Sequence, residues 1–252
     1  MAMIIESRQN ERVKAARALS LAKERRERGL HRAEGEKLVR EAIASGQSIT
    51  ELFVEEGFDA PAAPQATQRY SVTRGVLEAI SDTATPQHAV AIVKTPPSAP
   101  PAAYPAGLIV VLDGVQDPGN VGAILRSAVA FGAVGALLTA DCADPFADKA
   151  LRASMGSAYH LPIWRGDAAE QLSAMKAAGF LAICGRLDGA EKLPALRLCV
   201  ALVIGSEGHG ASAAALALCE GYRLPMPGRA ESLNAAVAAG IMIYQIAKEM
   251  PV

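Results

Sequence analysis

The run Leu108-Ile109-Val110-Val111-Leu112, followed directly by Asp113-Gly114, decides the fold class of this 252-residue chain. A continuous apolar run without alternating polar residues is typical of a parallel strand that is buried on both faces. Similar runs return at 136–139, 180–184 and 198–204, separated by helical patterns at 120–131, 148–153, 168–178 and 233–248. Strands that alternate with helices predict an α/β fold with a mostly parallel sheet covered on both faces.

A proline-rich stretch precedes this region. Five prolines fall within residues 95–105, where neither a helix nor a β-ladder can continue. We interpret 95–106 as a linker between two domains, 1–94 and 107–252. Upstream of it, the patterns predict a small α/β sandwich with helices at 10–28, 36–44 and 76–80 and strands at 49–54, 69–72 and 90–93.

The charge of the chain is unevenly distributed. The net charge is −1, but residues 1–41 hold eleven Lys or Arg against seven Glu, which gives +4 and leaves −5 for the remainder. A basic arm on an acidic body predicts an anionic partner, although it can also be a solvated helix face.

Composition also bears on location and on metals. No apolar run reaches the ~20 residues that cross a bilayer, and residues 1–8 lack the pattern of a secretory leader, so a cytoplasmic location without membrane contact is expected. The cysteines are widely spaced and form no C-x-x-C pair, so we expect reduced thiols and no metal site. They are Cys142, Cys184, Cys199 and Cys219.

Ligands of open parallel sheets bind at the carboxyl ends of the strands, where three segments are unusual. In the first, a Gly- and Pro-rich loop after Asp113 enters a helix at Asn120. Free backbone N–H groups there suit an anion or a ribose, but Asn120 can also be a simple N-cap. Arg126 lies about 120° away on the same helix, so periodicity alone does not put both residues in one site. The G-x-G-x-x-G spacing of dehydrogenase-type dinucleotide sites is absent.

The second and third segments follow at 203–210 and 224–240. Three glycines, at 205, 208 and 210, surround Glu207 and permit the close backbone approach of a ligand, while His209 is interpreted as a surface histidine. In the third, a proline-rich loop enters an Ala-rich helix that starts with Ser232-Leu233-Asn234. Ser232 can be an N-cap, and we expect Asn234 to be buried one step inside the helix.

Taken in order, these segments resemble the SpoU (TrmH-like) family of the SPOUT RNA methyltransferases. The family motifs N-x-G-x-x-x-R, G-x-E-G-x-G and proline-rich loop to S-L-N stand here at 120–126, 205–210 and 225–234. The amino-terminal part is similar to the family's ribosomal-protein-like RNA-binding extension through Ser7-Arg8-Gln9-Asn10, Glu34-Gly35 and the segment 81–87. The family usually has Gly after Gln87, where this chain has His88.

The resemblance implies a trefoil-knotted catalytic domain, a homodimer with its site near the interface, and S-adenosylmethionine as the cofactor. It implies transfer of a methyl group to a ribose 2′-hydroxyl of structured RNA, ribosomal RNA before tRNA, without a metal. The implied catalytic residues are Asn120, Arg126, Glu207, Ser232 and Asn234. The implied cofactor-binding residues are Thr139, Ile204, Gly205, Leu224, Met226 and Leu233. RNA phosphates would contact the basic arm through Arg8, Lys14, Arg25 and Arg32.

Alternatives remain for the reaction and for the protein as a whole. Arg126 can contact the target phosphate or act as the base, but a guanidinium is a poor base, so a positioning role is favoured. An RNA-binding factor that has kept the fold without the reaction is the main alternative, and the full set of polar motif residues argues against it. The specific RNA is left open, and a drug-resistance methylase of the same family is included among the possibilities.

Overall fold

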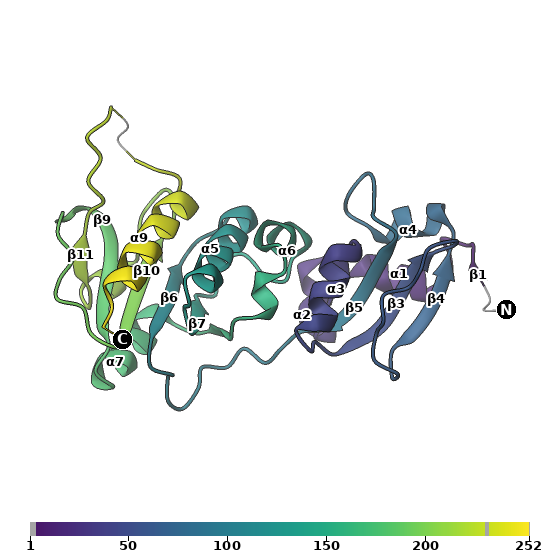
Figure 1. Ribbon diagram of the computed structural model, residues 1–252, viewed down its shortest axis with the longest axis horizontal. Helices are drawn as coiled ribbons and strands as arrows, with labels where there is room; N and C mark the ends of the chain where they lie inside the picture. Colours follow the sequence, from purple (N-terminus) through teal and green to yellow (C-terminus); the bar gives the residue numbers. More distant parts are fainter. Residues whose placement is uncertain (1–3, 230–231, 252) are drawn as a thin grey trace. The chain divides into compact units, whose positions relative to one another are not determined.

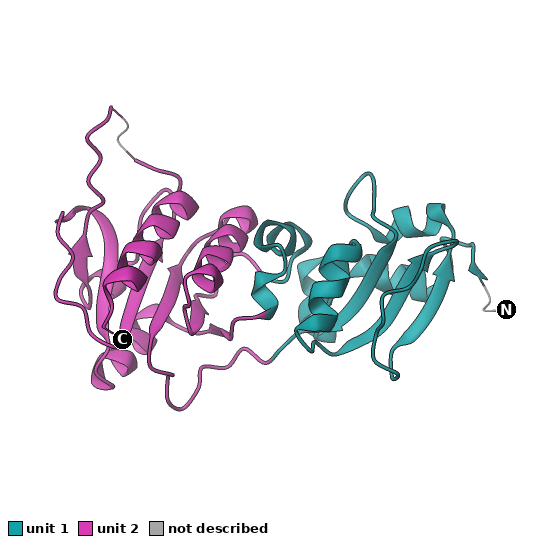
Figure 2. Ribbon diagram, viewed as in Figure 1, with its two compact units in different colours: residues 1–96, 146–159 teal, residues 97–145, 160–252 magenta. Residues whose placement is uncertain are grey.

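The computed structural model describes residues 4–229 and 232–251, which form two compact units (Figure 2). Unit 1 comprises Met1–Pro96 and Phe146–Tyr159, and unit 2 comprises Pro97–Pro145 and His160–Val252. The chain therefore leaves unit 1 at the start of the proline-rich stretch, returns for one short segment, and leaves it again.

The described part of unit 2 is built on a six-stranded sheet in the order β11-β9-β10-β6-β7-β8, in which every neighbouring pair is parallel. The predicted parallel sheet is thus confirmed. Its central strands β6 and β10 pair from Val200 with Leu108 to Gly205 with Asp113. The strands are β6 (Leu108–Asp113), β7 (Gly135–Leu138), β8 (Ile163–Arg165), β9 (Leu181–Ala190), β10 (Val200–Gly205) and β11 (Glu220–Tyr222).

Helices cover both faces of this sheet. On one face, α5 (Pro118–Ala130) packs beside α9 (Ala235–Glu249) (Figure 1). On the other, Leu172 and Met175 of α7 (Ala168–Ala177) join the buried cluster that contains Ile109 and Val111, together with α8 (Ala213–Leu216). Because side chains alternate along a strand, the odd-numbered residues of β6 face α7 and the even-numbered ones face the opposite side.

Unit 1 holds a mixed sheet in the order β1-β4-β3-β5-β2. Helices α1 and α4 pack on one face through a cluster that includes Val13, Leu77 and Phe53, and α3 contacts β2 and β5. The strands are β1 (Ile4–Ile5), β2 (Leu30–Glu34), β3 (Ile49–Glu55), β4 (Gln68–Val72) and β5 (Ala89–Lys94). The helices are α1 (Glu11–Ala18), α2 (Ala22–Arg28), α3 (Glu36–Ala44) and α4 (Arg74–Ile80).

Two sequence predictions for unit 1 were wrong in detail. The helix expected over 10–28 is broken into α1 and α2, and the Arg25 guanidinium donates to the carbonyls of Leu19 and Ser20 at the break. Gly29 does end α2, with φ of 60°. Strand β2 was not predicted because its sequence, LHRAE, is mostly polar; the fold buries those polar side chains against partners.

Those partners come from the segment Phe146–Tyr159, which packs in unit 1. It forms α6 (Asp148–Ser154) and the 3₁₀ turn η1 (Ser157–Tyr159). The Arg32 side chain, 2% exposed, lies 2.5 Å from Asp148 Oδ2, and it also donates to the carbonyl of Ile80 at 2.6 Å. His31 lies between Thr95 and Tyr159 at 3.1 and 3.2 Å. A buried ion pair thus ties β2 to a helix that begins more than a hundred residues later.

No helix within 4–229 and 232–251 is long and apolar enough to cross a membrane, and no group of His, Cys, Asp or Glu in the same ranges could hold a metal ion. All four cysteines are free thiols, and burial raises the pKa of Cys184 to about 11. The trefoil knot, implied by the family resemblance, stays a prediction.

Candidate active site

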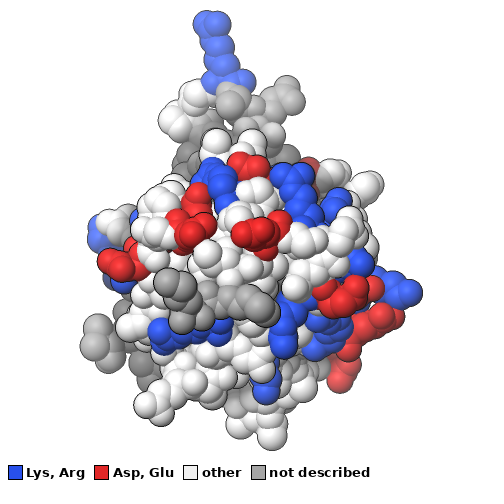
Figure 3. All heavy atoms as spheres, turned by 90° about the vertical axis from the view of Figure 1, so that its right-hand side faces the viewer, with Lys and Arg blue, Asp and Glu red and all other residues white. Residues whose placement is uncertain are grey.

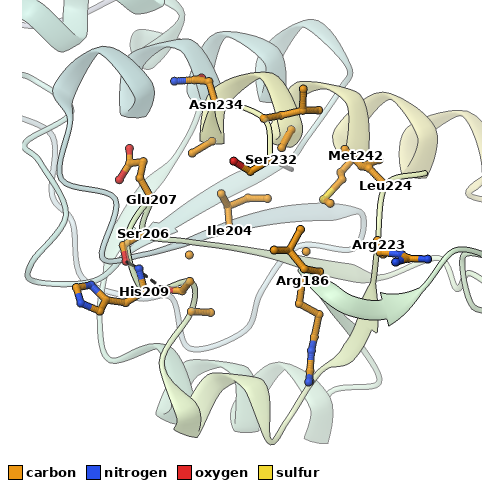
Figure 4. Close-up of a pocket in the computed structure, with 18 of the residues that line it drawn as sticks. Arg186, Ile204, Ser206, Glu207, His209, Arg223, Leu224, Ser232, Asn234 and Met242 are labelled. Carbon is orange, nitrogen blue, oxygen red and sulfur yellow. Dashed lines mark hydrogen bonds between the residues drawn. The ribbon is translucent and has the colours of Figure 1, made fainter. Parts of the chain in front are cut away.

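The three unusual segments meet in unit 2. Because β6 and β10 are adjacent and parallel, the loops that follow them leave the same edge of the sheet. The loop after β6 enters α5, the loop after β10 carries Glu207, and the start of α9 lies above them (Figure 4). Residues from three separate parts of the sequence are thereby brought together at one edge.

Asn120 is the centre of this arrangement. Its backbone N–H donates to the Asp117 side chain at 2.9 Å, and Asp117 is the N-cap of α5, with Pro118 in the first turn. Asn120 is therefore not the cap, and its side chain is left for the site. The amide Nδ2 donates to Glu207 Oε1 at 2.5 Å, while the amide oxygen accepts from Asn234 Nδ2 at 3.0 Å.

Asn234 itself is the N-cap of α9, which corrects the expectation of a buried residue inside the helix. The residue is exposed, and its side-chain oxygen accepts from the N–H groups of Ala236 and Val237 at 2.9 and 3.2 Å. The oxygen of the amide thus starts the helix, and the nitrogen of the same amide reaches Asn120. We call the linked side chains of Glu207, Asn120 and Asn234 the polar triad.

A cavity of about 780 Å³ opens beside the triad, within the range of sites that hold cofactor-sized molecules. In Figure 4, Glu207 and His209 lie at one end and Leu224 and Met242 at the other, with Ile204 between them. Of the residues expected to bind cofactor or to catalyse, those that line the cavity are Ile204, Gly205, Glu207, Leu224, Met226, Ser232, Leu233 and Asn234.

The shape of the cavity depends on glycine at position 205. A Cβ atom at Gly205 would lie 2.0 Å from the backbone of Gly210 and Ala211, because the loop turns back on itself and Ser206 pairs with Gly210. The close return of this loop leaves backbone groups at the end of β10 facing an apolar wall, which is a suitable environment for a nucleoside. The residues present therefore fit S-adenosylmethionine.

Three expected residues do not line the cavity: Asn120, which contacts the lining residues Glu207 and Asn234, and two others that lie apart from it. Thr139 is buried at the end of β7, where its hydroxyl accepts from the Gly114 N–H at 2.9 Å and donates to Asp141 at 2.5 Å. It shapes the loop after β6 and does not line the pocket. Arg126 is exposed on α5 and has no hydrogen-bond or ion-pair partner among the described residues. Within one chain, the structure does not bring Arg126 to the polar triad.

The residues expected to bind RNA divide into two pairs. Arg8 and Lys14 are exposed, each close to a carboxylate. Arg25 and Arg32 are buried with intramolecular partners, so their assignment to RNA phosphates is withdrawn. Across the described residues of α1 and α2, the exposed cations without such partners are Arg17 and Arg26. Figure 3 shows basic and acidic side chains interspersed on one face of unit 1.

The sequence reasoning missed two parts of the cavity. Strand β9 continues past Cys184, where the prediction ended it, and Gly185 lines the pocket against the side chain of Met242 from α9. A Cβ at Gly185 would lie 2.8 Å from the Met242 sulfur. Glycine directly after a buried strand was the available signal, and it is the same signal that had pointed to Gly205.

A parallel sheet with three polar loops that converge beside a nucleoside-sized cavity is typical of an α/β enzyme that binds a nucleoside cofactor. The family model described as "SpoU rRNA Methylase family" matches residues 107–244, and the chain belongs to this family. A second model, "MRM3-like substrate binding domain", matches residues 10–91.

Individual relatives span nearly the whole chain. A 23S rRNA (guanosine(2553)-2′-O)-methyltransferase, RlmP of Bacillus subtilis, is 34% identical over 96% of this chain and 98% of its own length. Among solved structures, an AdoMet-bound rRNA methyltransferase from Sinorhizobium meliloti is 31% identical with a TM-score of 0.88, covering 98% of both chains. The AdoMet complex of the SpoU methyltransferase AviRb from Streptomyces viridochromogenes is 26% identical with a TM-score of 0.83, covering 96% of this chain and 98% of its own.

Proposed function

We propose that this protein transfers a methyl group from S-adenosylmethionine to a ribose 2′-hydroxyl of ribosomal RNA. The observation that carries the proposal is the polar triad, in which Asn120 links the side chains of two residues that line the cavity, Glu207 and Asn234. A binding factor without a reaction would have no need to hold three polar side chains so closely beside a cofactor pocket.

The chemistry requires positioning above all. S-adenosylmethionine supplies a methyl group that is activated by its sulfonium sulfur. Ile204, Leu224 and Leu233 would hold the nucleoside part of the cofactor. The Asn120 amide donates a hydrogen bond to Glu207 Oε1. The other carboxylate oxygen, Oε2, has no partner among the described residues and can accept a hydrogen bond from a ribose hydroxyl. The triad thereby orients the hydroxyl oxygen for in-line attack on the methyl carbon. Most of the rate acceleration is expected from this positioning.

We assign the parts of the chain as predicted from the sequence: 1–94 binds the RNA, 95–106 links, and 107–252 catalyses, apart from the segment 146–159, which packs in unit 1. The match of a substrate-binding model to residues 10–91 supports the first assignment. The similarity to RlmP over nearly its whole length supports large-subunit ribosomal RNA as the substrate, and a cytoplasmic location follows from that substrate.

We further propose a homodimer. Val237, Ile241 and Tyr244 form an exposed apolar stripe on the outer side of α9, with exposed fractions of 51%, 40% and 48%. Phe131 lies beside Tyr244, with ring centroids 5.3 Å apart. A contiguous apolar surface of this kind favours association. Arg126 is exposed on α5, the helix that ends next to Phe131, so a second copy docked on the stripe would bring its own site within reach of Arg126.

The decisive experiment is methyl transfer from labelled S-adenosylmethionine to ribosomal RNA taken from a strain that lacks the gene. Nuclease digestion should release a resistant dinucleotide, because a 2′-O-methyl group blocks cleavage at its own phosphate. Mapping the modified position then identifies the nucleotide. A 2′-O-methyl product on tRNA alone would refute the ribosomal assignment, and no such product on any RNA would refute the reaction.

A further inference from the structure

Unit 1 carries an exposed aromatic ring that neither its core nor the proposed catalytic site uses. In the part of unit 1 that the structure describes, the exposed large hydrophobic residues are Leu21, Phe58 and Met155, and Phe58 is the aromatic one, at 47% exposure. It follows β3 after a tight turn in which the Phe58 N–H donates to the Glu55 carbonyl and Gly57 has φ of 84°. An exposed phenyl ring on a turn needs an explanation that core packing does not supply.

The ring is stacked on His88. The two ring centroids lie 3.5 Å apart and the planes are within 12° of parallel, so His88 covers one face of the phenyl ring, while Phe58 as a whole stays 47% exposed. A cavity of about 260 Å³ lies beside the pair, and Arg40, Pro61 and Asp59 contribute to its wall. We call the stacked rings the Phe58–His88 platform.

His88 takes up an unfavourable backbone conformation to form this stack. Its φ is +49°, a value that L side chains rarely adopt, and it is the centre of a three-residue turn in which the Ala89 N–H reaches the Gln87 carbonyl at 2.5 Å. A glycine at this position would adopt the turn without strain. Backbone strain at a non-glycine residue points to a use for its side chain.

The imidazole of His88 contacts the Glu55 carboxylate, which in turn contacts Arg74. His88 Nδ1 lies 2.7 Å from Glu55 Oε2, and the same carboxylate oxygen lies 3.1 Å from the Arg74 guanidinium, which also donates to the Pro86 carbonyl at 2.9 Å. Burial opposes the charge on Glu55, but these two partners hold the pKa of its carboxyl below the ordinary value. These contacts orient the imidazole plane on which the phenyl ring stacks.

We propose that the Phe58–His88 platform stacks one unpaired nucleobase of the RNA substrate. This inference rests on the proposed function, since it names the part of the RNA that unit 1 holds. Protein modules recognise single-stranded nucleotides by stacking splayed bases on aromatic rings. A phosphate would fit less well, because the cavity wall offers one arginine, Arg40, against the carboxylates of Glu36 and Asp59.

The first test compares full-length Phe58→Ala and Phe58→Trp proteins with the wild type. Each is assayed for methyl transfer to ribosomal RNA from the deletion strain. Phe58→Ala is expected to raise KM for the RNA about ten- to hundredfold, with kcat and the Kd for S-adenosylmethionine unchanged. Phe58→Trp should restore a KM near that of the wild type, and Leu198→Ala, which removes an exposed leucine of unit 2, serves as the control.

A second measurement separates stacking from a structural role. His88→Gly removes the lower ring; relief of the backbone strain offsets the loss of the contact with Glu55, so its thermal stability should stay close to that of the wild type while KM for the RNA rises. In the Phe58→Trp protein, RNA should quench the new exposed indole, whereas the buried Trp164 gives a constant background. An unchanged KM in Phe58→Ala together with no quenching would overturn the platform proposal, including the case in which Phe58 instead meets a protein partner. If the wild type methylates no RNA, the failure lies with the proposed function.

Discussion

The side-chain amide of Asn120 donates to the carboxylate of Glu207 at 2.5 Å, although the two residues are 87 positions apart in the sequence. Two adjacent parallel strands, β6 and β10, deliver the residues to the same edge of the sheet. A third segment, through Asn234, completes the link at 3.0 Å.

Asn120→Asp changes the shape of the side chain very little but replaces the donor to Glu207 with a second carboxylate. A hydrogen bond to a charged group contributes about 1.5–3 kcal/mol, so single-turnover methyl transfer should slow about ten- to hundredfold or more. Calorimetry should show nearly unchanged affinity for S-adenosylmethionine. A parallel loss of cofactor affinity would mean that Asn120 belongs to the cofactor site.

Substitutions at Asn234 should separate its two roles. Asn234→Asp keeps the oxygen that caps α9 and loses the donor to Asn120, so stability should hold while turnover falls. Asn234→Ala loses both, and the missing cap should cost about 1 kcal/mol in urea unfolding. Equal stability of the two variants would contradict the capping role.

Gly205→Ala should damage cofactor binding more than folding. The added methyl group would meet the backbone of Gly210 and Ala211 at 2.0 Å, and forcing the loop outward costs about 1–3 kcal/mol. Calorimetry should therefore show cofactor affinity reduced about tenfold or more. Gly228→Ala is the matched control, since nothing lies within 4 Å of its Cβ position. Equal cofactor affinity in both variants would argue against a role for this loop.

Ile241→Asp should prevent dimerisation. Ile241 lies in the middle of the exposed apolar stripe of α9, and an unpaired carboxylate in an apolar interface costs several kcal/mol. Sedimentation equilibrium should show a wild-type dimer and a variant monomer that remains folded by circular dichroism. A monomeric wild type would refute the proposed homodimer, and an active monomeric variant would show that Arg126 does not act across the interface.

Asp148→Ala should destabilise unit 1. Arg32 would stay buried without its carboxylate partner, and breaking a buried pair on one side costs about 3–5 kcal/mol. Urea unfolding should show this loss, whereas Glu27→Ala, which breaks the exposed pair with Lys23, should change stability by less than about 1 kcal/mol. Similar losses of unfolding free energy in the two variants would mean that the buried pair contributes no more to stability than the exposed pair.

The sequence predicted the elements whose signal is local. The apolar run of β6 and the glycines after β10 identify a buried strand and a close loop without reference to any distant residue. Strand β2 escaped prediction because His31, Arg32 and Glu34 are polar, and only partners from distant segments such as α6 make their burial favourable. Polar residues in a buried strand cannot be recognised before those partners are known.

The site was predictable as a set of residues but not as a set of contacts. Glu207 and Asn234 were identified because polar residues that follow a buried strand or begin a helix usually serve either as caps or as ligand-binding groups. Their meeting at Asn120 depends on the order of strands in the sheet, which short-range patterns do not encode. The same reasoning explains Arg25 and Arg32: a count of charge along the chain cannot distinguish a cation facing solvent from one that bonds to buried carbonyls.

The return of Phe146–Tyr159 to unit 1 has a consequence for synthesis on the ribosome. The amino terminus leaves the ribosomal tunnel first, so strand β2 emerges long before Asp148 does. Arg32 therefore lacks its carboxylate partner while the linker, β6, α5 and β7 are made. Domains generally complete their folding as units during synthesis. Here the first-made unit can close only after the opening strands of the second have already appeared, which makes the folding of the two units interdependent in time.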